Sequence, residues 1–148
     1  MCCKWQWAGP TAYLHQFVAD GRCYGQPDPD LDFEVLDERH VRLDRLLKKE
    51  KDSMTYEYDF GDGWEHNIEL EKVFPFDPQT TLPRCIKGNR ACPPEDVGGI
   101  WGYQEFLRAI RDANHPEHEE YLEWVGGAFD PDYFTVDAVN ELLSEYGK

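Results

Sequence analysis

The sequence of 148 residues has no apolar run of about 18 residues, the length that a transmembrane helix needs. Its first residues, M-C-C-K-W, lack the apolar core of a signal peptide. Cysteine is scarce, and its five residues are odd in number and irregularly spaced, which does not indicate a disulfide framework. We therefore expect a cytoplasmic protein with reduced thiols and no membrane association.

Cations are also few, since 15 Lys and Arg stand against 30 Asp and Glu, for a net charge of −15. Binding to duplex nucleic acid depends on Lys and Arg that neutralise phosphates. A surface with this charge repels polyanions at long range, so direct binding to nucleic acid or to anionic membranes is disfavoured. The acidic charge either keeps the protein in solution or attracts a basic protein partner.

Several catalytic signatures are missing as well. The chain has no glycine-rich phosphate loop, no G-x-S-x-G elbow, no internal repeat and no low-complexity tract. The H-P-E-H-E stretch at 115–119 is neither H-E-x-x-H nor H-x-x-E-H, so a metalloprotease helix is not indicated. The sequence predicts no cofactor from these motifs.

What the chain does have is enough apolar material for one globular domain, with 41% hydrophobic and 14% aromatic residues. Predicted strands come first and predicted helices follow, which is the α+β arrangement. We expect a mainly antiparallel sheet with a central hairpin, helices packed on it, and a helical C-terminal half. The elements are expected near 13–18 (strand), 43–50 (helix), 53–60 and 64–73 (hairpin), and 103–110, 116–125 and 136–146 (helices).

The hairpin is the most informative stretch, and residues 56–70 read Y-E-Y-D-F-G-D-G-W-E-H-N-I-E-L. A three-residue loop at 61–63 keeps the apolar side chains on one face, whereas a slip of one residue would move all of them to the other face. The predicted pairs are Phe60 with Trp64, Tyr58 with His66, and Tyr56 with Ile68.

The same register gathers acidic side chains at the turn, with Asp59 opposite Glu65 and Asp62 at the tip. Like charges directly opposite are unfavourable. Either the carboxylates cap backbone groups at a solvated tip, or a hard cation or a basic side chain compensates them. His66 on the apolar face is either a hydrogen-bonded core histidine or a ligand or base.

Two cysteines form the next candidate pair. Six residues separate Cys85 from Cys92, which is wider than the roughly two to four that usually separate paired zinc ligands. We expect two buried thiols. The alternative is a zinc site completed by His15 or His66.

The segment 93–99, P-P-E-D-V-G-G, places Glu95 and Asp96 between a stiff and a flexible dipeptide. These acids either line a cleft or cap the backbone at the entry of a helix. Three tryptophans are expected in the core, namely Trp64, Trp101 and Trp124.

The chain also resembles a known family. The motifs that carry the likeness are the hairpin at 56–66, Cys85 with Gly88, A-C-P-P-E-D-V-G-G at 91–99, W-V-G-G-A-F-D-P at 124–131, and L-H-Q-F at 14–17. They resemble the plasmid pRiA4b Orf-3-like family, which implies a small α+β domain that is sometimes labelled as associated with mobile elements. The resemblance implies no reaction. Members usually carry a strand and a helix before the L-H-x-F motif, so we expect a single domain over 1–148 that is truncated at its N-terminus.

Two functions follow from these observations. The first is a non-catalytic binding or accessory module that holds a basic protein through the hairpin tip and the 92–99 loop. The second is a metal-dependent enzyme, for instance a hydrolase, whose divalent metal is held by clustered histidines and carboxylates. The candidate site residues for the two are His15, Asp59, Asp62, Trp64, Glu65, His66, Glu95 and Asp96.

Overall fold

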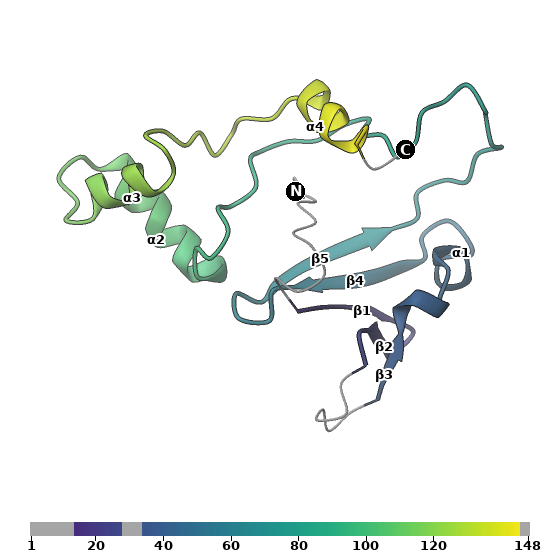
Figure 1. Ribbon diagram of the computed structural model, residues 1–148. Coiled ribbons are helices and arrows are strands. Elements are labelled where there is room, and N and C mark those ends of the chain that lie inside the picture. Colours follow the sequence, from purple (N-terminus) through teal and green to yellow (C-terminus); the bar gives the residue numbers. More distant parts are fainter. Residues whose placement is uncertain (1–13, 28–33, 146–148) are drawn as a thin grey trace. The chain divides into compact units, whose positions relative to one another are not determined.

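The computed structural model describes residues 14–27 and 34–145, and it contains a sheet and four α-helices (Figure 1). Contacts divide the chain into two compact units. Of the described residues, 14–27, 34–75 and Gly98–Ile100 form the sheet unit, and 76–97 and 101–145 form the helical unit. The single domain expected from the sequence stays a prediction.

The described part of the sheet unit contains five strands in the order β3-β2-β1-β4-β5. Their bounds are β1 His15–Ala19, β2 Arg22–Gly25, β3 Val35–Asp37, β4 Ser53–Tyr58 and β5 Trp64–Glu69. All neighbouring pairs are antiparallel except β2 with β3, so the mainly antiparallel α+β prediction is confirmed. The prediction of a central hairpin is wrong for the described strands, because among these β1 pairs with both β2 and β4 and β5 lies at the edge.

The hairpin register differs from the predicted one by two residues. Tyr58 pairs with Trp64, Tyr56 with His66, and Met54 with Ile68. The connection is longer than expected because Asp59 leaves the strand with a positive φ of 52° and its carbonyl accepts a 2.6 Å hydrogen bond from the Gly63 N–H. Phe60 therefore lies in the turn and is 45% exposed. An even slip preserves the faces, so the predicted apolar face is confirmed although its pairs are not.

The core of this unit lies against the apolar face of the sheet. Its buried members are Ala19, Tyr24, Leu47 and Met54, and partly buried Phe17, Leu36, Val41, Leu46, Ile68 and Leu70 pack around them. A short 3-10 helix η1 (Glu38–His40) and α1 (Leu43–Leu46) precede β4 and bring the leucines to this core.

Helix α1 is shorter than the predicted helix at 43–50. The Asp52 carboxylate accepts the backbone N–H groups of Lys48 and Lys49 at 2.8 and 3.0 Å, and Leu47 already has extended φ and ψ. These two hydrogen bonds lower the pKa of Asp52. The side chain therefore ends the helix by capturing amides that another turn would have used.

The helical unit holds α2 (Gly99–Arg111), α3 (His118–Trp124) and α4 (Val136–Leu143), and the first two residues of α2 group with the sheet unit. The fully buried Phe106 ring is its centre. Aromatic rings surround it at centroid distances of 5.2 Å (Phe129), 5.5 Å (Tyr121), 5.8 Å (Trp124) and 6.2 Å (Tyr103). The helical C-terminal half is thus confirmed. The packing of these helices on the sheet stays a prediction.

The tryptophans depart from the sequence-based expectation. Trp101 is 81% exposed, because it lies five residues before Phe106 and so falls off the buried stripe of α2. Trp124 is 46% exposed and Trp64 is half-buried. The core prediction is wrong for Trp101 and only partly met by the other two.

The end of α3 and the start of α4 agree with the boundaries predicted at 125 and 136, whereas α3 begins two residues later than predicted and α4 ends at Leu143 rather than at 146. Gly126 and Gly127 have φ of 81° and 103° after α3, and the Gly127 N–H donates to the Leu122 carbonyl at 2.7 Å. The Thr135 hydroxyl accepts from the Ala138 N–H at 3.4 Å at the start of α4.

The 76–97 loop is tied to the helical unit by specific contacts. The Asn140 side chain accepts from the Cys85 N–H at 2.7 Å and donates to the Cys85 carbonyl at 3.0 Å. Gly88 packs so closely on the Phe134 ring that a Cβ would lie 2.2 Å from it. Cys85 and Cys92 are half-buried, so the prediction that both are buried is not met.

Candidate functional site

The carboxylates at the hairpin tip serve the backbone. Asp59 Oδ1 accepts from the N–H groups of Gly61 and Asp62 at 3.0 and 3.4 Å, which stabilises the turn. Asp62 Oδ2 accepts from the Gly98 N–H at 3.1 Å. The capping interpretation of these two acids is therefore confirmed.

The contact between Asp62 and Gly98 joins two sequence motifs that are 36 residues apart. Gly98 and Gly99 both have positive φ, at 86° and 64°. A Cβ on Gly99 would lie 2.2 Å from the carbonyl oxygen of Asp62, so the hairpin tip rests directly on this backbone. Gly99 is required here because only glycine combines a left-handed backbone with such a close approach, and the positive φ of Gly98 also favours glycine.

The polar face of the hairpin carries Glu57 opposite Glu65. The predicted pair of Asp59 with Glu65 is wrong, since Asp59 belongs to the turn. The Gln16 side-chain amide on β1 donates to the Glu57 carboxylate. A hydrogen-bond donor on the neighbouring strand thus relieves part of the repulsion between the facing acids.

The other face carries two rows of half-buried aromatic and histidine side chains that run across three strands. One row is Phe17, Tyr56 and His66, and the other is His15, Tyr58 and Trp64. The Tyr56 ring lies between the two histidine rings, at centroid distances of 5.9 and 5.7 Å. Nδ1 of His66 donates to the Tyr56 carbonyl at 3.3 Å, which confirms a hydrogen-bonded histidine.

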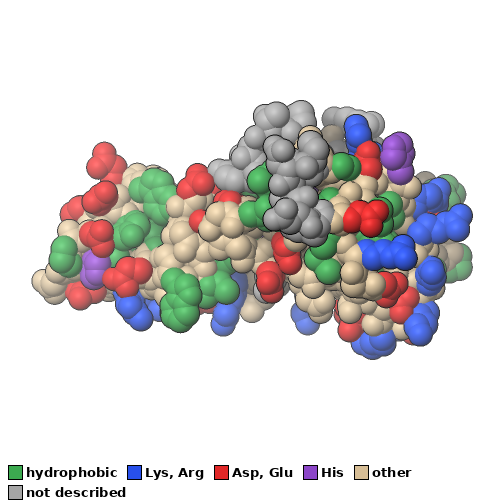
Figure 2. Space-filling view, turned by 90° about the horizontal axis from the view of Figure 1, so that it is seen from below, with side chains coloured by type: hydrophobic (Ala, Val, Ile, Leu, Met, Phe, Trp, Pro, Cys, Tyr) green, Lys and Arg blue, Asp and Glu red, His purple; other side chains and the backbone are tan. Residues whose placement is uncertain are grey.

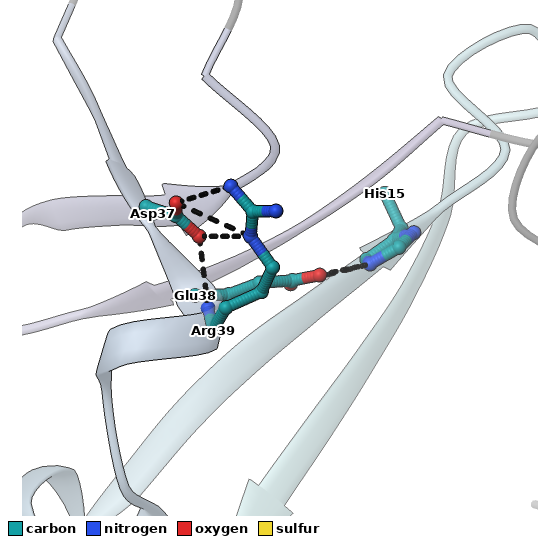
Figure 3. Close-up of polar contacts among 4 residues, drawn as sticks. All are labelled: His15, Asp37, Glu38 and Arg39. Carbon is teal, nitrogen blue, oxygen red and sulfur yellow. Dashed lines mark hydrogen bonds and ion pairs between the residues drawn. The ribbon is translucent and has the colours of Figure 1, made fainter.

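His15 has a partner that the sequence did not indicate (Figure 3). Its Nε2 donates to the two Glu38 carboxylate oxygens at 3.1 and 3.2 Å, and both side chains are half-buried. The two residues are 23 positions apart. No local spacing in the sequence predicts this pair, because it depends on where η1 falls after β3.

A second ion pair lies next to it in Figure 3. The Arg39 guanidinium donates to Asp37 at 2.7 to 3.2 Å, and the Arg39 backbone N–H donates to the same carboxylate. These contacts lower the pKa of Asp37 from 3.8 to about 2. Arg39 is thereby occupied by an internal partner.

The candidate residues therefore do not form one cluster on the sheet unit. Trp64 and His66 share the aromatic face with His15, while Glu65 points to the opposite face because neighbours in a strand alternate. Glu95 and Asp96 belong to the helical unit, and Asp96 has a φ of 58°. Within residues 14–27 and 34–145, no group of three or more His, Cys, Asp or Glu could hold a metal ion.

The charges are distributed unevenly along the sequence. The segment 39–51 contains six Lys and Arg. Part of this positive charge is neutralised within the sheet unit, for example by Arg42 with Asp44 at 3.0 Å and by Lys51 with Glu69 at 2.8 Å. In contrast, the segment 112–147 contains ten acids and no Lys or Arg.

Comparison with known proteins agrees with these motifs. Residues 3–138 match the family model of the plasmid pRiA4b ORF-3-like protein. The chain belongs to this family. The hairpin tip and the Gly98–Gly99 backbone, which contact each other, both lie in the matched region of this pRiA4b ORF-3-like chain.

The chain is similar to a curated protein and to a solved structure. The uncharacterized protein y4hQ of Sinorhizobium fredii (strain NBRC 101917 / NGR234) is 42% identical over 119 residues, which are 80% of this chain and 61% of y4hQ. The chain thus spans about three fifths of the length of this curated relative. The crystal structure of the protein of unknown function MM3350 from Methanosarcina mazei Go1 matches with a TM-score of 0.74 at 32% identity, covering 87% of this chain and 74% of MM3350.

Among residues 14–27 and 34–145, no helix combines the length and the apolar character that a membrane span requires.

Proposed function

We propose that this family member is a non-catalytic binding module that holds a basic protein partner through its helical unit. The observation that carries the proposal is the segment 112–147, with ten acids and no Lys or Arg. We call the exposed carboxylates around α3 the acidic surface, and its members are Glu117, Glu119, Glu120 and Glu123. The sequence pointed instead to the hairpin tip, whose Asp59 and Asp62 carboxylates bind the backbone of the sheet unit.

The acidic surface has charge that is not compensated within the described part of the chain. None of its four carboxylates forms an ion pair there. Its field reaches a neighbouring side chain, since burial raises the pKa of Tyr121 and the charges of Glu117, Glu105 and Glu120 raise it further. Figure 2 shows red acidic side chains gathered over α2 and α3, at the left of the view. Uncompensated charge of one sign attracts partners of the other sign and accelerates their association.

A half-exposed aromatic ring lies on the same helix as the acids. Trp124 is 46% exposed at the end of α3, and Glu117, Glu120 and Tyr121 precede it at helical spacings of seven, four and three residues. A Lys or Arg side chain binds favourably over an indole ring as well as to a carboxylate. The combination therefore suits basic side chains better than it suits a small apolar ligand.

The remaining observations fit a binding role. The metal-dependent enzyme has no convergent ligand set among the described residues that would support it. Cys23 and Cys85 are free thiols, which supports a reducing cytoplasmic compartment. Neither relative's name states an activity that would favour catalysis.

The test measures binding of a peptide rich in lysine and arginine by isothermal titration calorimetry over a series of salt concentrations. The triple variant Glu119→Lys, Glu120→Lys, Glu123→Lys is expected to bind about tenfold more weakly, equivalent to about 1.4 kcal/mol. The matched control changes the charge equally on the sheet unit, through Glu34→Lys, Glu50→Lys and Glu71→Lys, all of which are exposed.

The control variant is expected to keep its affinity within about twofold at 0.15 M salt, where exposed charges more than about 8 Å apart are largely screened. Equal losses in the two variants would mean that only net charge matters, and the acidic surface would then not be a binding site. The absence of any salt-sensitive binding would overturn the proposal altogether.

A further inference from the structure

A depression of about 630 Å³ lies on α2 and the turn that follows it. Its lining residues are Gln104, Leu107, Arg108, Arg111, Asp112 and His115, all of which belong to the helical unit. The first four follow i, i+3, i+4, i+7 spacing and therefore form one stripe along the helix. This stripe differs from the one that buries Phe106 and Ala109.

The depression is lined by both positively charged side chains of the segment 101–147. Arg108 and Arg111 are the only Lys or Arg residues between positions 101 and 147, where the sequence has eleven acids. Both of them line this one depression. A requirement for solubility does not explain why the two cations of this segment line the same depression.

The wall of the depression is held in place by hydrogen bonds. Glu105 accepts from Arg108 Nη1 at 2.8 Å with one carboxylate oxygen and from His115 Nε2 at 3.3 Å with the other. His115 Nδ1 accepts from the Glu117 N–H at 3.2 Å, so the ring proton lies on Nε2. Both ring nitrogens of His115 therefore form hydrogen bonds, which fix the orientation of the imidazole on this side of the depression.

Arg111 differs from Arg108, because it forms no ion pair within the described residues. The charge of Arg111 acts on Tyr103: burial raises the pKa of this tyrosine, and the positive charge of Arg111 lowers it. A guanidinium offers several N–H donors in a planar fork that matches a carboxylate or a phosphate. The side-chain amide of Gln104 lies on the same stripe as a further donor.

We propose that this depression binds the oxyanion group of a small molecule, with Arg111 as its main partner and Arg108 and Gln104 beside it. Leu107 supplies an apolar surface for the remainder of the ligand. Asp112 on the lining repels a second negative charge, which favours a ligand that carries a single anionic group. This site is separate from the acidic surface and does not depend on the proposed function.

The test follows backbone amide shifts by NMR while butyrate, inorganic phosphate or the neutral butyramide is added to the whole protein. Saturable shifts are expected at Gln104, Leu107 and Arg111 with a Kd on the order of 1 mM, as befits a ligand of few atoms. Arg111→Gln is expected to weaken binding at least tenfold, and Gln104→Ala is expected to weaken it less. Arg84→Gln, an exposed arginine of the same unit outside the depression, is the matched control.

Each outcome decides the question. Saturation by butyrate alone identifies a carboxylate ligand, and saturation by phosphate alone identifies a phosphate ligand. No saturation with either anion, equal weakening in Arg84→Gln, or an equal response to butyramide overturns the proposal. Unchanged spectra of the free variants show that the loss does not come from unfolding.

Discussion

The contact between the hairpin tip and the start of α2 can be tested by adding one methyl group. Gly99→Ala would place a Cβ 2.2 Å from the Asp62 carbonyl oxygen, at a backbone φ of 64°. Gly63→Ala is the matched control, because Gly63 has a φ of 67° and its added Cβ would have no atom within 4 Å. Both glycines group with the sheet unit.

The two substitutions share one cost and differ in another. A left-handed backbone costs a non-glycine residue about 1–2 kcal/mol, and this term applies to both variants. Overlap with neighbouring atoms that cannot move freely adds about 1–3 kcal/mol, and this term applies only to Gly99→Ala. We therefore expect Gly99→Ala to lose about 2 kcal/mol more unfolding free energy than Gly63→Ala.

Urea unfolding followed by circular dichroism measures the difference, provided that the slopes with denaturant agree between the variants. The same experiment on Asp62→Ala is expected to show a loss of about 1–2 kcal/mol, because the Gly98 N–H loses its acceptor. Equal losses for the two glycine variants would refute the close approach of the hairpin tip to α2.

Three further predictions follow from the packing and from the pKa values. Phe106→Ala is expected to lower the free energy of unfolding by about 3–5 kcal/mol because the ring is fully buried. Trp101→Ala on the same helix is expected to change it by no more than about 0.5 kcal/mol, because Trp101 is exposed. Urea unfolding compares the two variants, and equal losses would contradict the packing. Asn140→Ala is expected to cost about 1–3 kcal/mol and to speed proteolysis of the loop whose backbone it binds; unchanged cleavage would show that the clamp is dispensable. The contribution of Asp37 to stability is expected to be complete above its ordinary pKa of 3.8 and to disappear as the pH falls through about 2; an NMR titration that shows no rise of this pKa in Arg39→Gln would count against the pair.

Period-two alternation was a sound guide to the hairpin. It predicted which side chains share the apolar face, because this depends only on whether a residue number is odd or even along a strand. It did not predict the pairs, since the loop length depends on the backbone conformation of Asp59, and a slip of two residues leaves the faces unchanged.

The helices were predicted well where local chemistry ends them. Gly126 and Thr135 act through their own backbone or side chain, so their roles can be read from neighbouring residues. Trp101 was misplaced because its exposure depends on which stripe of α2 packs against the neighbouring aromatic rings.

In the candidate site, too, the sequence indicated local contacts but not contacts between distant residues. That Asp59 and Asp62 cap backbone groups was one of two interpretations of the sequence. It is supported by the hydrogen bonds that Asp59 accepts within the turn and by the one that Asp62 accepts from the Gly98 N–H. The pair of His15 with Glu38 had no signal in the sequence, because 23 residues separate its members.

The sequence by itself determined the family, the α+β class, the apolar face of the hairpin and the strongly acidic charge, because these depend on composition, alternation and motifs that are local. The tertiary structure alone decided the strand order, the contact of Asp62 with Gly98 and the depression along the stripe of α2 that carries Arg108 and Arg111. Strand order and the contact with Gly98 join segments that are distant along the chain. The depression depends on which stripe of a helix its neighbours leave uncovered. The spacing along α2 places the two arginines on one stripe, but neither the distant contacts nor the depression can be read from that spacing.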